Sequence, residues 1–261
     1  MKIEIITEDD PLYILPFFDE FLRNYGSDFQ VVHVSLCRTM GKRPRKQMVR
    51  ELTLLYGPLG FSRLLGRAAA ARIGGLFSLP RTAKRFHTLP QLCKAFSISY
   101  EHTGNPNDTN FVARLRERAP DLLVSVACPH ILKKSVLDIP PLGCINIHHA
   151  PLPRYKGMMP SFWQLYHGER KAGLTIHFMS SELDQGAALF QGGLEIEAGE
   201  SLDHLILRSK RYGAHCMAKV LDQLRSGTQQ AVVLDQSTGS YFTFPRLEEI
   251  RDFKRRGLRA I

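Results

Sequence analysis

The chain has 261 residues, 44% of them hydrophobic and 23% charged, and its formal charge is +10. This composition is typical of a soluble globular protein. The start MKIEIITEDD is too acidic and its apolar run too short for a signal peptide, and no stretch of twenty apolar residues follows, so we expect a cytoplasmic protein. The five cysteines are scattered and form no Cys-x-x-Cys pair, which argues against a disulfide framework or a zinc site.

Strands and helices are predicted to alternate along the chain. Predicted strands cover residues 2–6, 31–36, 97–100, 122–126, 144–147, 174–179 and 187–196. Predicted helices cover residues 11–25, 89–95, 108–118, 130–136, 161–166 and 202–225. The strands are apolar on both faces, which favours a sheet covered by helices on both sides. The fold class is therefore α/β, with a doubly wound, mostly parallel, Rossmann-like sheet and a short C-terminal extension.

Residues 38–85 interrupt this alternation with a strongly basic segment. It holds twelve Lys or Arg and one acidic residue, Glu51, and so carries a charge of +11, which leaves the rest of the chain close to neutral. Its apolar part, residues 52–79, predicts two short amphipathic helices separated by Gly57-Pro58. The segment indicates an anionic partner, either phosphate groups or a lipid surface, or else a solvated loop.

The common nucleotide-binding motifs are absent. No Gly-x-Gly-x-x-Gly follows the first predicted strand, and no Gly-x-x-x-x-Gly-Lys-Ser/Thr occurs. We therefore expect no NAD or ATP site of the usual kind.

Polar side chains end the predicted strand 144–147. Asn146 and His148 are two residues apart and project to the same face, at the carboxyl end where open α/β sheets bind ligands. An imidazole can accept a proton, an amide can donate to an oxyanion, and Asp184 in a later turn could orient the imidazole. The alternative is a purely structural role, in which Asn146 and His148 cap the strand and Asp184 stabilises the turn that contains it.

Residues 144–189, CINIHHAPLPRYKGMMPSFWQLYHGERKAGLTIHFMSSELDQGAAL, resemble the folate-dependent formyltransferase family, which is marked by Asn-x-His, a proline-containing loop, a glycine and a later Asp-x-Gly. The resemblance extends over about residues 89–227 and includes the preceding stretch PDLLVSVACPHILKKSVLDIPPLG. It implies transfer of a formyl group from 10-formyltetrahydrofolate to an amine, with Asn146, His148 and Asp184 as catalytic residues. Asn146 and protonated His148 would stabilise the oxyanion, while protons move through His148 or a water held by Asp184.

The resemblance also implies binding residues. The cofactor would lie against two loops, with contacts from Pro129, His130, Ile131, Leu132, Ser180, Ser181, Glu182 and Leu183. The substrate would be contacted by Arg154, Lys156, Gly157 and Met159. Phe162 and Trp163 either line the acceptor pocket or belong to the core.

The chain departs from the family pattern at two positions. Ala150 stands where a Ser is usual, and His149 stands where a Pro is more common. His149 points away from the His148 face, so we expect it to serve packing. Cys144 lies on the Asn146 face without a partner that would activate it, and we expect it in the core.

The layout is closest to the amino-sugar N-formyltransferase branch, with a catalytic domain over 1–227 and a short extension over 228–261. The expected acceptor is a primary amine on a phosphate-bearing carrier, such as an amino sugar on a nucleotide. Alternatives are a methionyl-tRNA formyltransferase, which requires nucleic-acid binding, and a formyltetrahydrofolate hydrolase. A non-enzyme alternative is a membrane-surface or partner-binding module built on a retired formyltransferase fold. Residues 40–85 could place the protein peripherally on an anionic membrane. The sequence leaves open whether the protein forms an oligomer.

Overall fold

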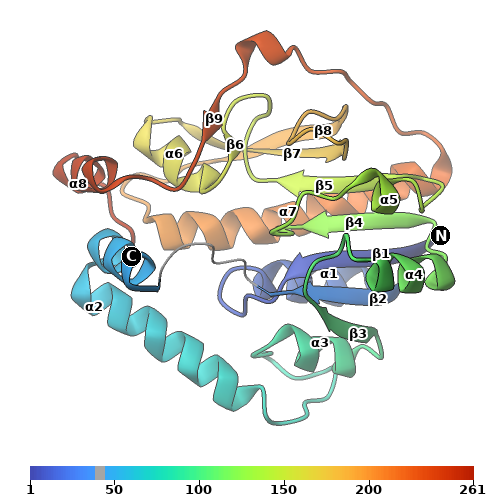
Figure 1. Ribbon diagram of the computed structural model, residues 1–261. Coiled ribbons are helices and arrows are strands. Elements are labelled where there is room, and N and C mark those ends of the chain that lie inside the picture. Colours follow the sequence, from blue (N-terminus) through green and yellow to red (C-terminus); the bar gives the residue numbers. More distant parts are fainter. Residues whose placement is uncertain (39–44) are drawn as a thin grey trace.

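The computed structural model describes residues 1–38 and 45–261, so residues 39–44 of the basic segment lie outside the described part. A seven-stranded sheet forms the centre of the molecule (Figure 1). Its strands are β1 (Lys2–Glu8), β2 (Gln30–Cys37), β3 (Ser99–Thr103), β4 (Leu122–Val126), β5 (Cys144–His148), β7 (Lys171–Phe178) and β8 (Ala188–Glu195). A separate two-stranded sheet joins β6 (Lys156–Gly157) to β9 (Tyr241–Phe242).

The strand order is β3-β2-β1-β4-β5-β7-β8. The first five strands in this order pair in parallel, whereas β7 pairs antiparallel with β5 and β8 antiparallel with β7. The order turns at β1, from which the chain proceeds first to one side and then to the other, as in doubly wound sheets. The prediction of an α/β, mostly parallel, Rossmann-like sheet is confirmed.

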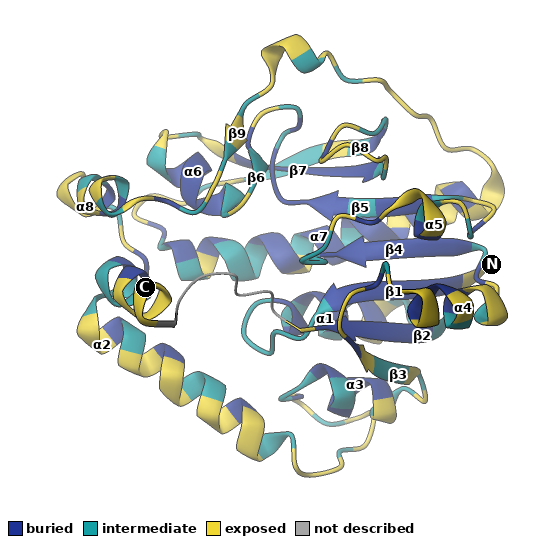
Figure 2. Cartoon of the chain, viewed as in Figure 1, coloured by how far each residue is buried: buried dark blue, intermediate teal, exposed yellow. Residues whose placement is uncertain are grey.

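Helices cover both faces of this sheet. The helices of the described residues are α1 (Leu15–Tyr25), α2 (Arg45–Gly74), α3 (Leu89–Ala95), α4 (Thr109–Arg118), α5 (Lys134–Leu137), α6 (Pro160–Tyr166), α7 (Leu202–Ser226) and α8 (Leu247–Arg255), with a 3-10 turn at Gln236–Thr238. α1 and α7 pack on one face in a large apolar cluster, and α4 contributes Phe111, Val112 and Leu115 to a smaller cluster on the other face. The sheet interior is buried on both sides (Figure 2).

The predicted helix over 130–136 begins four residues later than expected, because α5 starts at Lys134. Asn107 holds the preceding loop in another conformation. Its side chain accepts a hydrogen bond from the backbone N–H of Lys133 (2.7 Å) and donates one to the carbonyl oxygen of Ile131 (3.0 Å). These bonds engage backbone groups that a helix would use and leave residues 130–133 as a loop at the sheet edge.

α2 contains the break that Gly57-Pro58 predicts. Gly57 has φ 71° and ψ 163°, outside helical geometry, and Pro58 follows it inside the helix. α2 extends away from the sheet (Figure 1), and much of its surface is exposed (Figure 2). Within the described residues, no helix is both long and apolar enough to span a membrane.

The segment after residue 227 returns across the molecule. Val232 bridges Ala188 of β8, β9 pairs with β6, and α8 buries Ile250 and Phe253. Those two side chains join a third apolar cluster, which includes residues of α2, α6 and the start of α7. The catalytic-domain boundary at 227 remains a prediction.

Gln164 joins three segments beneath the loop that follows β5. Its buried side chain donates to the carbonyl oxygens of His149 (2.8 Å) and Pro160 (3.2 Å) and accepts from the N–H of Gly173 (2.6 Å). A Cβ at Gly173 would collide with Pro151, so the strand and the loop approach each other closely here. Gln164 thereby fixes the end of β5 against β7.

Replacing Gln164 with Leu should lower the free energy of unfolding by about 2–4 kcal/mol, because the Gly173 N–H and the His149 carbonyl would lose their partner while still buried. Urea denaturation measures the change. Gln223→Leu, on an exposed position of α7, is the matched control and should change the free energy by less than about 0.5 kcal/mol. Equal stability of the two variants would contradict the role given to Gln164.

Candidate active site

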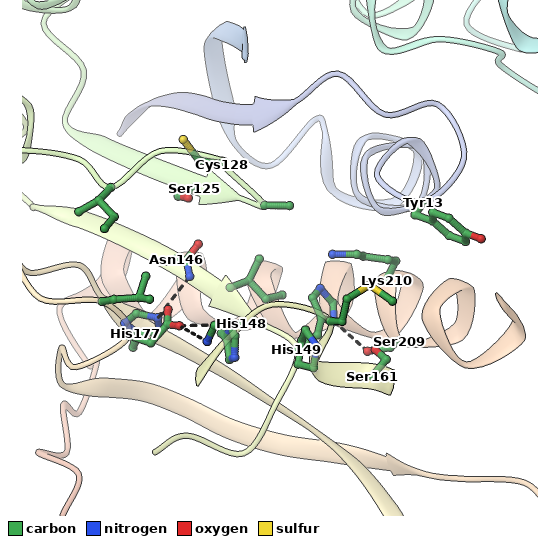
Figure 3. Close-up of a pocket in the computed structure, with 18 of the residues that line it drawn as sticks. Tyr13, Ser125, Cys128, Asn146, His148, His149, Ser161, His177, Ser209 and Lys210 are labelled. Atoms are coloured by element: carbon green, nitrogen blue, oxygen red, sulfur yellow. Dashed lines mark hydrogen bonds and ion pairs between the residues drawn. The ribbon is translucent and has the colours of Figure 1, made fainter. Parts of the chain in front are cut away.

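Four polar side chains meet at the carboxyl end of β5. The antiparallel register of β5 and β7 sets Asn146 opposite His177, and the Asn146 Nδ2 lies 3.3 Å from the His177 Nε2. The carboxylate of Asp184 lies 3.7 Å from both imidazoles, with Oδ1 toward His177 Nε2 and Oδ2 toward His148 Nδ1 (Figure 3). Asn146, His148 and Asp184 are thus brought together, with His177 between the amide and the carboxylate.

The hydrogen bond to Tyr155 fixes the orientation of the His148 ring. Nε2 lies 2.8 Å from the carbonyl oxygen of Tyr155 and must donate to it, since a carbonyl oxygen can only accept. Nδ1 is therefore the ring nitrogen that can exchange a proton. A proton bound there faces the Asp184 carboxylate, which stabilises the charged ring.

Backbone geometry brings Asp184 to this position. Its φ is +54°, in the left-handed region that Asp tolerates better than most residues, and its side chain is buried. Oδ2 accepts a hydrogen bond from the N–H of Gly157 (3.2 Å). Gly157 has φ +94°, and a Cβ there would collide with the carbonyl oxygen of Phe242. Glycine is thus required at the position that supplies this N–H.

Burial lowers the pKa of His177 below its usual value, although its bond to the Phe178 carbonyl and the charge of Asp184 act in the opposite direction. The ring is therefore neutral at neutral pH. Its Nδ1 donates to the Phe178 carbonyl oxygen (2.8 Å), which leaves Nε2 as an acceptor for the Asn146 amide. One N–H of Asn146 is held by His177, and the other has no partner among the described residues and can donate to a ligand.

A cavity of about 450 Å³ lies over this cluster. Asn146, His148 and Asp184 line it, as do six of the eight residues predicted to contact the cofactor: His130, Ile131, Leu132, Ser180, Glu182 and Leu183. Pro129 and Ser181 are not among its lining residues. The two loops predicted to hold the cofactor therefore border the same cavity as the residues predicted to be catalytic.

Two of the four residues predicted to contact the substrate line this cavity. Gly157 and Met159 line the cavity, but Arg154 and Lys156 are not among its lining residues. Arg154 pairs with Glu169 (2.7 Å), and Lys156 donates to Gln236 (3.3 Å). Both cations are turned outward because the loop after β5 directs them toward neighbouring surface segments.

Several lining residues come from elements that sequence reasoning did not connect with the site. They are Tyr13 before α1, Leu52 and Tyr56 of α2, His177 of β7, and Ile206, Ser209 and Lys210 of α7. His177 had a usable signal: it lies in the predicted strand directly before the Asp184 turn. His149 is buried, as expected for a packing residue, but it also lines the cavity. Trp163 belongs to the third apolar cluster.

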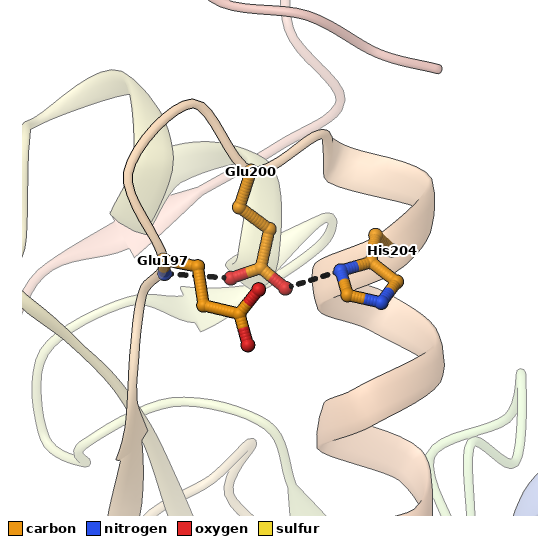
Figure 4. A group of neighbouring side chains, drawn as sticks. All are labelled: Glu197, Glu200 and His204. Carbon is orange, nitrogen blue, oxygen red and sulfur yellow. Dashed lines mark hydrogen bonds and ion pairs between the residues drawn. The ribbon is translucent and has the colours of Figure 1, made fainter.

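Among the described residues, one group of side chains has the spacing of metal ligands, and it lies outside the cavity. The ligand atoms of Glu197, Glu200 and His204 fall within 4.8 Å of one another at the start of α7 (Figure 4). Arg208 Nη1 lies 2.7 Å from Glu200 and 3.1 Å from Glu197. The guanidinium already compensates these carboxylates, so we assign no metal to them.

A family model described as formyl transferase matches residues 81–221, more than half of the chain. Methionyl-tRNA formyltransferases are among the similar curated proteins. The chain is 40% identical to the one from Pelobacter propionicus over 131 residues, covering 50% of this chain and 41% of that protein. It is 38% identical to the one from Ruminiclostridium cellulolyticum over 135 residues, covering 50% and 42%. The aligned part spans less than half the length of these relatives.

Solved structures with a similar fold are more distant in sequence. A sugar N-formyltransferase from a Shewanella species has a TM-score of 0.57 and 18% identity, with 98% of this chain and 79% of that chain covered. Glycinamide ribonucleotide transformylase 1 from Symbiobacterium toebii has a TM-score of 0.60 and 16% identity, with 90% and 94% covered. At these identities the similarity shows a shared fold.

We predict that Asp184→Asn lowers the pKa of His177 further, because the variant removes a negative charge that raises it. In the unchanged protein, burial should already hold the pKa of this ring below its usual value. Nitrogen NMR of histidine-labelled protein follows both titrations. Asp138→Asn removes an exposed carboxylate outside the cavity and should leave the pKa of His177 in place. An upward shift in Asp184→Asn would contradict the arrangement described.

Proposed function

Because the chain belongs to the formyl transferase family, we propose that it transfers a formyl group from 10-formyltetrahydrofolate to a primary amine. The observation that carries this proposal is the convergence of Asn146, His148 and Asp184 at one cavity. Their groups match the needs of acyl transfer to nitrogen, which are a hydrogen-bond donor for an oxyanion and an acceptor for the proton of the amine.

The residues divide the chemistry between them. The folate co-substrate supplies the formyl carbon. The free N–H of Asn146 donates to the oxygen that becomes negative when the amine nitrogen bonds to that carbon. His148 accepts the proton of the amine at Nδ1, and Asp184 stabilises the charged ring. The bond between the formyl carbon and N10 of the folate then breaks, and His148 returns the proton to that nitrogen, so that tetrahydrofolate leaves. Removal of one donor of this kind typically costs about 10²–10³ in turnover.

The two loops that border the cavity suit the folate. Ile131 is 58% exposed and Leu183 is 40% exposed, and both line the cavity. Exposed apolar side chains on these two loops can contact the face of the flat ring system of the folate. Neighbouring backbone groups can hydrogen-bond its edge. This supports residues 129–132 and 180–183 as the folate contacts.

For the acceptor we favour an amino sugar on a nucleotide or another phosphate-bearing carrier. A sugar N-formyltransferase whose fold covers 98% of this chain supports that choice. The curated relatives favour a second candidate, formyl transfer to methionyl-tRNA, because the chain is 40% identical to one such enzyme over 131 residues, half of this chain. The third candidate function is that of a formyltetrahydrofolate hydrolase.

We propose a cytoplasmic enzyme that associates peripherally with anionic membrane through α2 and the residues that follow it. Residues 52–100 contain seven Lys or Arg and no Asp or Glu. Five large apolar side chains are exposed in this part: Leu59, Leu65, Ile73, Leu76 and Phe77. Exposed apolar groups flanked by cations are typical of helices at anionic bilayer surfaces. The intact catalytic cluster speaks against a membrane module that has lost activity.

Incubation with 10-formyltetrahydrofolate and a panel of acceptors tests the reaction and the acceptor. The panel contains nucleotide-linked amino sugars, initiator methionyl-tRNA and glycinamide ribonucleotide, and mass spectrometry detects a formyl adduct. We expect an adduct on an amino sugar, and at least about 10²-fold lower turnover in His148→Ala. An adduct on the tRNA would support the second candidate, and formate release without an acceptor would support the hydrolase.

His204→Ala is the control for this experiment, since it removes an exposed imidazole that lies outside the cavity. Turnover in this variant should equal that of the unchanged protein. Near-normal turnover in a folded His148→Ala variant would contradict the proposed role of His148.

Vesicle flotation tests the membrane proposal. The protein should float with vesicles that contain phosphatidylglycerol and not with phosphatidylcholine alone. The double variant Leu76→Ser/Phe77→Ser should bind at least about tenfold more weakly, because each buried apolar side chain contributes about 1.5–3 kcal/mol. Val232→Ser/Val233→Ser alters exposed apolar residues elsewhere and is the matched control. Equal binding of both variants, or no binding, would refute the proposal.

A further inference from the structure

The first turns of α2 carry an apolar face that leads from the surface into the cavity. Met48 and Val49 are 41% and 45% exposed, whereas Leu52 and Tyr56, further along the helix, line the cavity. Spacings of three, four and seven residues put these four side chains on one face of the segment that ends at Gly57. This face therefore connects solvent with the cavity of the proposed catalytic residues.

The wall of the cavity beside α2 is apolar as well. Met159, Phe162 and Ile206 line it, and together with Tyr56 they belong to the third apolar cluster or pack against it. Figure 1 shows the start of α2 on the side of the sheet toward which β4 and β5 point. A ligand that enters past the start of α2 therefore meets hydrocarbon and aromatic surface before it reaches the end of β5.

The two tyrosines of this wall direct their hydroxyl protons to protein groups. Tyr13 donates to the carboxylate of Asp203 (2.7 Å), so Tyr56 must donate to the hydroxyl oxygen of Tyr13 (3.2 Å). Arg67 donates to both carboxylate oxygens of Asp203 (2.8 and 3.0 Å). Since Tyr56 and Arg67 lie on either side of Gly57, these bonds hold both halves of α2 against the start of α7. The tyrosines thus offer a ligand their rings and not an O–H donor.

Two cations accompany the outer end of the apolar face. Lys46 and Arg50 are exposed in the same turns of α2 as Met48 and Val49. Lysine and arginine form charge-assisted bonds with phosphate oxygens, while apolar side chains beside them contact hydrocarbon. The outer end of the face therefore has the chemistry that a phosphate joined to an alkyl chain requires.

We propose that the acceptor amine is carried on a phosphate-bearing lipid whose hydrocarbon chain lies along Met48, Val49 and Leu52. This proposal deepens the proposed function and rests on it. Past Gly57 the same helix continues into the exposed apolar side chains proposed to contact the bilayer, so the chain would pass from the membrane to the cavity along one element.

The size of the cavity fits this division of the acceptor. About 450 Å³ is within the range of a pocket for one small molecule, so the amine-bearing end enters and the hydrocarbon chain stays outside. The loops proposed for the folate carry Ile131 and Leu183, whereas the acceptor would enter past Leu52 and Tyr56. Of the two kinds of phosphate-bearing carrier, this arrangement favours a lipid over a nucleotide.

Calorimetric titration without folate tests the lipid carrier independently of formyl transfer. The probes are the methyl and dodecyl phosphodiesters of glucosamine 1-phosphate, which share amine and phosphate and differ only in the alkyl chain, below the critical micelle concentration. The dodecyl ester should bind at least about a hundredfold more tightly, because its methylene groups leave water. Met48→Ser/Val49→Ser should reduce this preference at least about tenfold. Val232→Ser/Val233→Ser, which alters exposed apolar residues outside the cavity, is the matched control and should keep it.

Two further measurements complete the test. In the unchanged protein, the NMR signal of the Met48 methyl group should shift with the dodecyl ester and not with the methyl ester, which does not depend on the folding of any variant. In the transfer reaction, the dodecyl ester should have the lower KM. Equal affinity of the two esters, an unmoved Met48 signal, or a chain preference that survives Met48→Ser/Val49→Ser would overturn the lipid carrier, even if the amino sugar is formylated. Absence of formyl transfer to these esters and to every soluble acceptor would instead refute the proposed reaction, and the lipid carrier with it.

Discussion

The carboxylate of Asp184 contacts three segments that lie far apart in sequence. One oxygen faces the ring of His177 and the other faces the ring of His148 and accepts the N–H of Gly157. Each contact constrains a different element: β7, the end of β5, and the short strand β6. This one buried acid therefore links the imidazole of His148, strand β7 and the loop after β5, whereas burial is what keeps His177 neutral.

Much of this arrangement was predictable because it follows from local periodicity. Asn146 and His148 share a face since they are two residues apart in a strand, and the carboxyl end of a parallel strand is where ligands bind. The alternation of strands and helices likewise predicted the sheet. The helix break at Gly57 followed from the backbone freedom of glycine and the proline after it.

What the sequence could not predict depends on contacts between distant segments. Side-chain bonds from Asn107, more than twenty residues away, displace the start of α5. His177 enters the site through antiparallel pairing with β5, and pairing partners are not encoded in the pattern of a single strand. Lys210 lies on a helix whose cavity-facing side is set only when α7 packs beside α1. Arg154 and Lys156 looked like ligand contacts, but their nearest partners are protein groups.

The pairing of β6 with β9 joins two parts of the chain that the ribosome synthesises at different times. Gly157 pairs with Phe242, and the next N–H, that of Met158, donates to the Phe242 carbonyl oxygen (2.8 Å). The backbone that supplies an N–H to Asp184 is therefore braced by residues synthesised more than eighty positions later. During translation the central sheet and the cluster around Asp184 leave the ribosome before β9, so the strand that pairs with Gly157 is made after them. The backbone support of Gly157, and through it of Asp184, therefore comes late in synthesis.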